Sequence, residues 1–220
     1  MVSVISSRNL AGMPNPPELM RIMQSLAMLD AALEEEWDYR YFSFNAKWST
    51  TSQMGSMRNG SGDDLFAHFD AAGCFLRGFD HESFMSPWRR EERGVWPGVL
   101  DAVPGEFADG RNEPAFHMAD TSFCIWHGPK GEGWQHGPIA FPEGSDPDGS
   151  AWMLSFYDGN PETYRAFAGE YFEIDLATDA IARVFAHEPL SPALLSALGS
   201  TRDWADIAAD AEEIGYPICG

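Results

Sequence analysis

The fold is decided by the stretch Ser52-Gln-Met-Gly-Ser-Met-Arg-Asn-Gly-Ser-Gly-Asp-Asp-Leu-Phe-Ala-His-Phe-Asp-Ala-Ala-Gly-Cys-Phe-Leu-Arg-Gly78. Its Asn59-Gly60 pair favours a two-residue hairpin turn, because both residues tolerate the positive φ that such a turn needs. A second turn is predicted at Asp70–Gly73. We therefore expect strands at 52–58, 64–69 and 74–78 that pair as an antiparallel meander.

A long helix is predicted before this meander. Apolar side chains recur at intervals of three and four from Leu19 to Trp37, which places them on one face of a helix of about twenty residues that begins near Pro17. The acidic run Glu34–Glu36 follows, with the sign that the helix dipole disfavours at a carboxyl end. This run indicates a frayed end or carboxylates held for a partner. An aromatic, strand-like segment then fills 37–48.

Shorter elements are predicted after residue 78. The expected strands are 115–118 with 121–126, 134–141 and 151–157, and the expected helices are 96–107, broken at Pro104, a helix from Pro161, 191–198 and 203–214. The segment 146–150 is predicted to be a turn, because a calcium loop beginning there would need Glu where Tyr157 stands. In all, we expect one α+β domain over residues 1–220. It would have an antiparallel sheet of about six strands, with an N-terminal helix and C-terminal helices packed on it.

The charge balance limits the function classes. The chain has 14 Lys and Arg against 34 Asp and Glu, a net charge of −20. This charge disfavours binding of nucleic acid and of anionic membrane surfaces, since both need clustered cations. The acidity either steers a basic partner or a cation to the protein, or keeps a cytosolic protein soluble.

The cysteines and the N-terminus indicate a cellular compartment. Cys74, Cys124 and Cys219 are too few and too far apart for a disulfide framework or a zinc cluster, and their odd number favours a reducing environment. The first residues show no signal-peptide pattern, and nowhere do eighteen apolar residues stand together. We expect a cytoplasmic, soluble protein.

The densest chemistry lies at Asp80, His81 and Glu82, directly after the strand that ends near Gly78. In one interpretation, Asp80 caps a short helix through its carboxylate. In the other, the three side chains face a shared pocket, where His81 is a ligand or proton carrier that a carboxylate orients. Because adjacent residues point in different directions, a divalent metal there would need further ligands, for which His68 and His117 are the candidates.

Two tryptophans, Trp88 and Trp126, are further binding candidates. No cofactor is expected, and a divalent metal is the one alternative that the sequence leaves open. The chain contains no Gly-x-Ser-x-Gly, His-Glu-x-x-His, Walker or dinucleotide-binding pattern, so no catalytic residue is assigned.

Four segments carry a resemblance: Gly78–Ser83, Phe123–Trp126, Asp158–Tyr164 and Ile214–Pro217. Together they resemble an uncharacterised family of bacterial cytosolic proteins. The acidic, Trp-rich, single-domain style is similar to that of immunity proteins of bacterial toxin systems. The resemblance implies no catalytic residue.

Two hypotheses follow from the sequence. The first is an acidic, non-enzymatic binding protein of the immunity type that masks a basic protein partner, such as a toxin nuclease. The second is a small metal-assisted hydrolase centred on Asp80, His81 and Glu82. The missing catalytic motifs favour the first, and the oligomeric state stays open.

Overall fold

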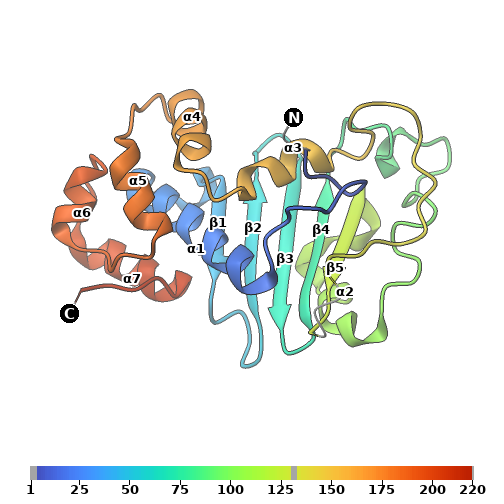
Figure 1. The fold of residues 1–220 in the computed structure, drawn as a ribbon, viewed down its shortest axis with the longest axis horizontal. Coiled ribbons are helices and arrows are strands. Elements are labelled where there is room, and N and C mark those ends of the chain that lie inside the picture. Colours follow the sequence, from blue (N-terminus) through green and yellow to red (C-terminus); the bar gives the residue numbers. More distant parts are fainter. Residues whose placement is uncertain (1–3, 130–132, 220) are drawn as a thin grey trace. The chain divides into compact units, whose positions relative to one another are not determined.

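The computed structural model describes residues 4–129 and 133–219. Its five strands form one sheet in chain order, an antiparallel meander (Figure 1). The strands are β1 (Phe42–Asn45), β2 (Gln53–Arg58), β3 (Asp64–Asp70), β4 (Gly73–Phe79) and β5 (Phe123–His127). The α+β class, the N-terminal helix and the C-terminal helices are confirmed, whereas the sheet has five strands rather than about six.

Two compact units divide the chain. Unit 1 comprises the residues up to Pro16 and Ser56–Ser155, and unit 2 comprises Pro17–Gly55 and the residues from Phe156 onward. The single domain expected from the sequence stays a prediction.

Both α-helices and short 3-10 helices occur among the described residues. The α-helices are α1 (Pro16–Leu33), α2 (Ala108–Arg111), α3 (Ser150–Leu154), α4 (Pro161–Tyr171), α5 (Thr178–Phe185), α6 (Pro192–Ala197) and α7 (Trp204–Ile214). Short 3-10 helices are η1 (Trp37–Tyr39), η2 (Pro87–Arg89), η3 (Gly105–Phe107), η4 (Pro114–Phe116), η5 (Met118–Asp120) and η6 (Ser155–Tyr157). Within the described ranges, no helix is both long and apolar enough to cross a bilayer.

Strands β3, β4 and β5 form the centre of unit 1. Arg77 pairs with Phe66 and Cys124 across the ladders, so these three side chains share one face, while Cys74 lies on the other. Both thiols are buried, and burial raises their pKa, whereas Cys219 is exposed. The Arg77 face is covered by η3, α2 and η4. Phe107 of η3 and Gly110 of α2 lie against Phe75, and the Phe116 ring of η4 stacks on Phe66 with 5.1 Å between centroids.

Helix α1 is confirmed, and its acidic end is fixed rather than frayed. The Arg202 guanidinium donates to the carbonyl oxygens of Ala31 (2.7 Å) and Glu34 (3.2 Å), and Arg40 donates to those of Glu34 (2.9 Å) and Glu35 (3.0 Å). Both guanidiniums also bind the Asp210 carboxylate. Two arginines therefore supply the positive charge that the end of this helix lacks locally.

Four expected elements are wrong, for local reasons. Residues 151–157 form α3 and η6 instead of a strand, because the Asp146 carboxylate accepts from the amides of Ala151 (3.0 Å) and Trp152 (3.1 Å) and starts a helix. Residues 115–118 lie in 3-10 turns, since Glu113 caps the amide of Ala115 at 3.0 Å.

The other two wrongly predicted elements are segments that proline or glycine interrupts. Residues 134–141 make only the bridge between Gln135 and Trp126, and Pro138, which lacks an amide hydrogen, lies within the segment. In 96–107 the described chain is not helical before η3, because Gly98 (φ 93°) and Ala102 (φ 65°) are in the left-handed region.

A buried carboxylate organises unit 2. Asp30 in α1 is fully buried, and its two oxygens accept from the amide of Phe42 in β1 (2.8 Å) and the hydroxyl of Tyr164 in α4 (2.7 Å). Burial raises the pKa of Asp30 to about 7. One side chain thus joins three elements of unit 2.

We predict that Asp30→Ala lowers the free energy of unfolding by about 2–4 kcal/mol, because it leaves a buried amide and a buried hydroxyl without an acceptor. Urea denaturation measures this. Tyr164→Phe is the control, since it removes one donor and should cost about 1 kcal/mol. The folded pKa lies above the ordinary value of 3.8, so Asp30 favours the folded state at low pH and wild-type stability should fall as pH rises from 3.8 towards about 7. Equal stability of Asp30→Ala and wild type would contradict the assignment.

The hairpin between β2 and β3 is confirmed, but its loop has five residues instead of two. The amide of Asn59 donates to the carbonyl of Asp63 at 3.2 Å, and Gly60 (φ 71°) and Gly62 (φ 114°) take the left-handed positions. No heavy atom lies within 4 Å of the position of a Cβ at Gly60. A substitution there consequently tests backbone strain alone.

We predict that Gly60→Ala costs about 1 kcal/mol of stability, because an L-residue resists this φ. Gly94→Ala is the matched control, since Gly94 has equally open space around a Cβ but no positive φ. Melting temperatures of the two variants give the comparison. Identical values would show that the loop relaxes without strain.

Candidate functional site

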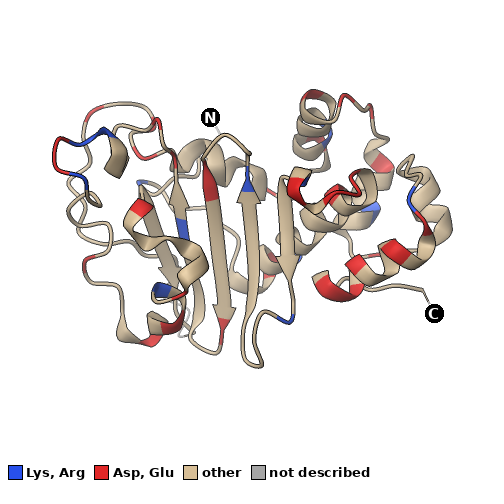
Figure 2. Cartoon of the chain, turned by 180° about the vertical axis from the view of Figure 1, so that it is seen from behind, with Lys and Arg blue, Asp and Glu red and all other residues tan. Residues whose placement is uncertain are grey.

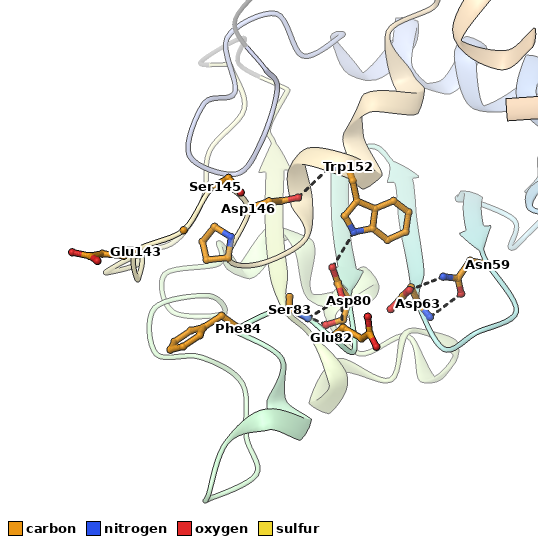
Figure 3. A pocket seen from close by; sticks show the side chains of 12 residues that line it. Asn59, Asp63, Asp80, Glu82, Ser83, Phe84, Glu143, Ser145, Asp146 and Trp152 are labelled. Carbon is orange, nitrogen blue, oxygen red and sulfur yellow. Dashed lines mark hydrogen bonds between the residues drawn. The ribbon is translucent and has the colours of Figure 1, made fainter. Parts of the chain in front are cut away.

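An open pocket of about 600 Å³ in unit 1 lies beyond the end of β4 (Figure 3). Its walls come from the β2–β3 loop, the turn after β4, the segment 143–147 and α3. The residues that line it are Asn59, Asp63, Asp80, Glu82, Ser83, Phe84, Glu143, Gly144, Ser145, Asp146, Pro147 and Trp152. Five of these described side chains are carboxylates, and none is Lys or Arg.

Asp80 is the structural centre of this pocket. One carboxylate oxygen accepts from the amides of Glu82 and Ser83, both at 2.9 Å, and the other accepts from Nε1 of Trp152 at 2.9 Å (Figure 3). The capping role expected for Asp80 is therefore present, but it caps a turn instead of a short helix. The same side chain also fixes the indole of Trp152 against the pocket.

His81 is not among the residues that line the pocket, but it binds Asp63, which is. The amide of His81 donates to Oδ1 of Asp63 at 2.8 Å, and its ring Nδ1 lies 2.6 Å from the same oxygen. The other Asp63 oxygen accepts from Nδ2 of Asn59 at 2.5 Å. The hydrogen bond with Asp63 is the main cause that raises the pKa of His81, and the nearby charges of Asp63, Glu82 and Asp80 add to it.

Glu82 extends into solvent at the rim. Its side chain is 85% exposed, and Oε1 lies 3.9 Å from Nε2 of His81. Glu143 is also exposed. The pocket therefore combines three carboxylates that hydrogen bonds hold in place, Asp63, Asp80 and Asp146, with two at its rim.

The structure does not gather the three histidines that the sequence suggested as metal ligands. In the part of the chain that the structure describes, the group of metal-capable side chains with donor atoms within 4.8 Å is Asp63, Asp80 and His81. His68 is buried, with Nδ1 3.5 Å from Oδ2 of Asp70, and His117 is exposed between η4 and η5. Because hydrogen bonds already engage Asp80 and Nδ1 of His81, we assign no metal ligand here.

Sequence reasoning missed Asp63, although one feature of the sequence points to it. Asp64 pairs with Phe79 in the antiparallel β3–β4 ladder. The residue before Asp64 and the residue after Phe79, which are Asp63 and Asp80, therefore lie close together. Asp146 and Trp152 were also missed, because the sequence predicted only a turn and a strand there, and so was Glu143, which lies between two predicted elements.

The two candidate tryptophans differ in exposure. Trp88 is 58% exposed but held in place, with Nε1 donating to Asp120 at 2.8 Å and the Arg93 guanidinium 3.8 Å above the ring. Trp126 in β5 is 3% exposed and belongs to the core. Of the pair, only Trp88 is accessible to a partner.

Two arginines contact the backbone of the segments that form the pocket walls. Arg8 donates to the carbonyl of Gly144 at 2.9 Å, and Arg89 donates to that of Glu82 at 2.6 Å. Both bind backbone oxygens and pair with no carboxylate of the pocket through these bonds. The five carboxylates thus outnumber the neighbouring cations.

Comparison of the chain with family models, curated proteins and solved structures finds no match. The chemistry of this pocket must consequently be argued from its own residues.

We predict that Asp80→Ala lowers stability by roughly 0.5 to 2 kcal/mol, because the amides of Glu82 and Ser83 and the indole of Trp152 lose their acceptor. Glu82→Ala, on the same turn, should leave the melting temperature unchanged. Calorimetry of both variants measures the difference. A loss of stability in Glu82→Ala as large as that in Asp80→Ala would contradict the central role of Asp80.

Proposed function

We propose that this chain is an acidic, non-enzymatic, cytoplasmic binding protein of the immunity type, and that its pocket receives a Lys or Arg side chain of a basic protein partner. The observation that supports it is a pocket whose described lining contains five carboxylates and neither Lys nor Arg. The acidic, Trp-rich style of the sequence, which is similar to that of immunity proteins of bacterial toxin systems, points in the same direction.

The pocket has the chemistry that a long basic side chain needs. Asp63 and Asp80 are held by hydrogen bonds, so their negative charge is fixed in place before a ligand arrives. Trp152 and Phe84 add aromatic surface, and Phe84 is 58% exposed. Aromatic faces attract cations and cover the apolar stem of Lys or Arg.

The rest of the surface favours the same kind of partner. Figure 2 shows Asp and Glu along α7 as well as on loops of unit 1, in a chain with a net charge of −20. Such a field accelerates the approach of a basic protein and repels acidic ones. A nuclease, whose own surface must attract phosphates, is a partner with this property.

The metal-assisted hydrolase centred on Asp80, His81 and Glu82 stays the alternative prediction. A metal ion must bond directly to lone pairs of its ligands, whereas a Lys or Arg side chain is also attracted by the charge of carboxylates that it does not touch. Asp80 already accepts three N–H donors, so the geometry favours recognition of a basic side chain. Metal content of the purified protein tests the alternative.

We predict that the protein binds the peptide acetyl-Arg-Arg-Arg-Arg-amide and does not bind its citrulline isostere, which has the same shape without the charge. Isothermal titration at low ionic strength measures both, and added salt should weaken the binding. The double variant Glu82→Gln/Glu143→Gln should lower the affinity about fivefold, since it removes two negative charges from the pocket rim.

The matched control is Glu170→Gln/Asp179→Asn, which removes two exposed carboxylates of unit 2. It should change the affinity little. An equal loss in both double variants would show that net charge alone attracts the peptide and that the pocket is not the binding site.

A further inference from the structure

We propose that His81 makes the affinity of this pocket for a basic side chain depend on pH, with binding weakest when the imidazole is protonated. The inference rests on the proposed function and concerns the regulation of the same pocket.

The position of His81 carries the argument. Its ring Nδ1 lies 2.6 Å from Asp63, and its Nε2 lies 3.9 Å from Glu82, so the imidazole stands between two carboxylates of the pocket lining. The ring also packs against the hairpin loop, where a Cβ at Gly62 would lie 3.6 Å from Nδ1. A charge on this ring therefore acts directly on the carboxylates that a bound cation would use.

The charged groups around His81 are mostly acidic. Asp63 faces it from the β2–β3 loop, and Asp80 and Glu82 come from its own turn. Arg89 in η2 donates to the carbonyl of Glu82, and α3 contributes the uncharged indole of Trp152, which is bound to Asp80. This surrounding favours the imidazolium, and in agreement the pKa of His81 is raised from its ordinary value of 6.5, with Asp63 as the main cause.

Protonation and partner binding must then oppose each other. The imidazolium neutralises part of the charge of Asp63 and Glu82, and it repels a guanidinium or ammonium group in the pocket. When the pH rises and the ring loses its proton, the full negative charge becomes available. Linkage requires the reverse effect as well, so a bound cation must lower the pKa of His81.

The test is a titration of acetyl-Arg-Arg-Arg-Arg-amide from about pH 5.5 to about pH 8.5, the range in which histidine changes charge, at constant ionic strength and with a chelator present. Wild-type affinity should rise about threefold across this range, as expected for one partly screened charge near the ligand. His81→Asn should bind at every pH as wild type does at high pH. Its Nδ2 can still donate to Asp63, but it carries no charge.

A second measurement is independent of any variant. NMR titration of the His81 ring in the wild-type protein should show a lower pKa in the peptide complex than in the free protein. An unchanged pKa would overturn the inference, as would the same pH dependence in wild type and His81→Asn. Absence of peptide binding at every pH would instead overturn the proposed function. If His81→Asn does not fold, the NMR titration alone decides.

Discussion

The pocket depends on one constraint: a carboxylate that is shielded from solvent must accept hydrogen bonds from protein groups. Asp148 is 1% exposed, and it accepts from the hydroxyls of Ser7 and Ser150 and from the amide of Ser150. Burial raises the pKa of Asp148, and these hydrogen bonds oppose that rise by favouring its charged form. Ser122 continues the network, since its hydroxyl donates to the carbonyl of Asp148 and accepts from the amide of Asp80. The N-terminal segment, the loop before α3 and the pocket turn are therefore fixed by one buried set of polar groups.

The elements that the sequence predicted correctly are those that local chemistry determines. Helix α1 follows from its apolar periodicity, and α4 begins where Asn160 accepts from the amide of Glu162 at 3.1 Å. Gly215, with φ 73°, ends α7 as expected. The meander was predictable because its turns have distinctive residues. In each case the deciding side chains lie within a few positions of the element they define.

The misassigned segment after residue 150 depends on a capping side chain just outside it, and most of the site depends on contacts between distant residues. The apolar segment after residue 150 fits a strand or a helix equally well, and the Asp146 carboxylate decides for a helix. Asp80 is a candidate from the sequence, but its partner Trp152 is 72 positions away, and Asp63 reaches His81 only because β3 and β4 pair. An isolated triplet of ionisable residues therefore pointed to the candidate pocket without showing which other residues line it.

The binding of Arg202 and Arg40 to the carboxyl end of α1 has a consequence for synthesis on the ribosome. Helix α1 is synthesised well before its partners, since Arg202, which binds the carbonyl of Ala31, is made 171 positions later, and Asp210 later still. Asp30 likewise waits for Tyr164, 134 positions later. The apolar face of α1 must then stay uncovered by these partners while unit 1 is translated, the period in which a nascent chain is most prone to aggregate. Unit 2 can thus be completed only after the intervening segment, Ser56–Ser155 of unit 1, has been translated.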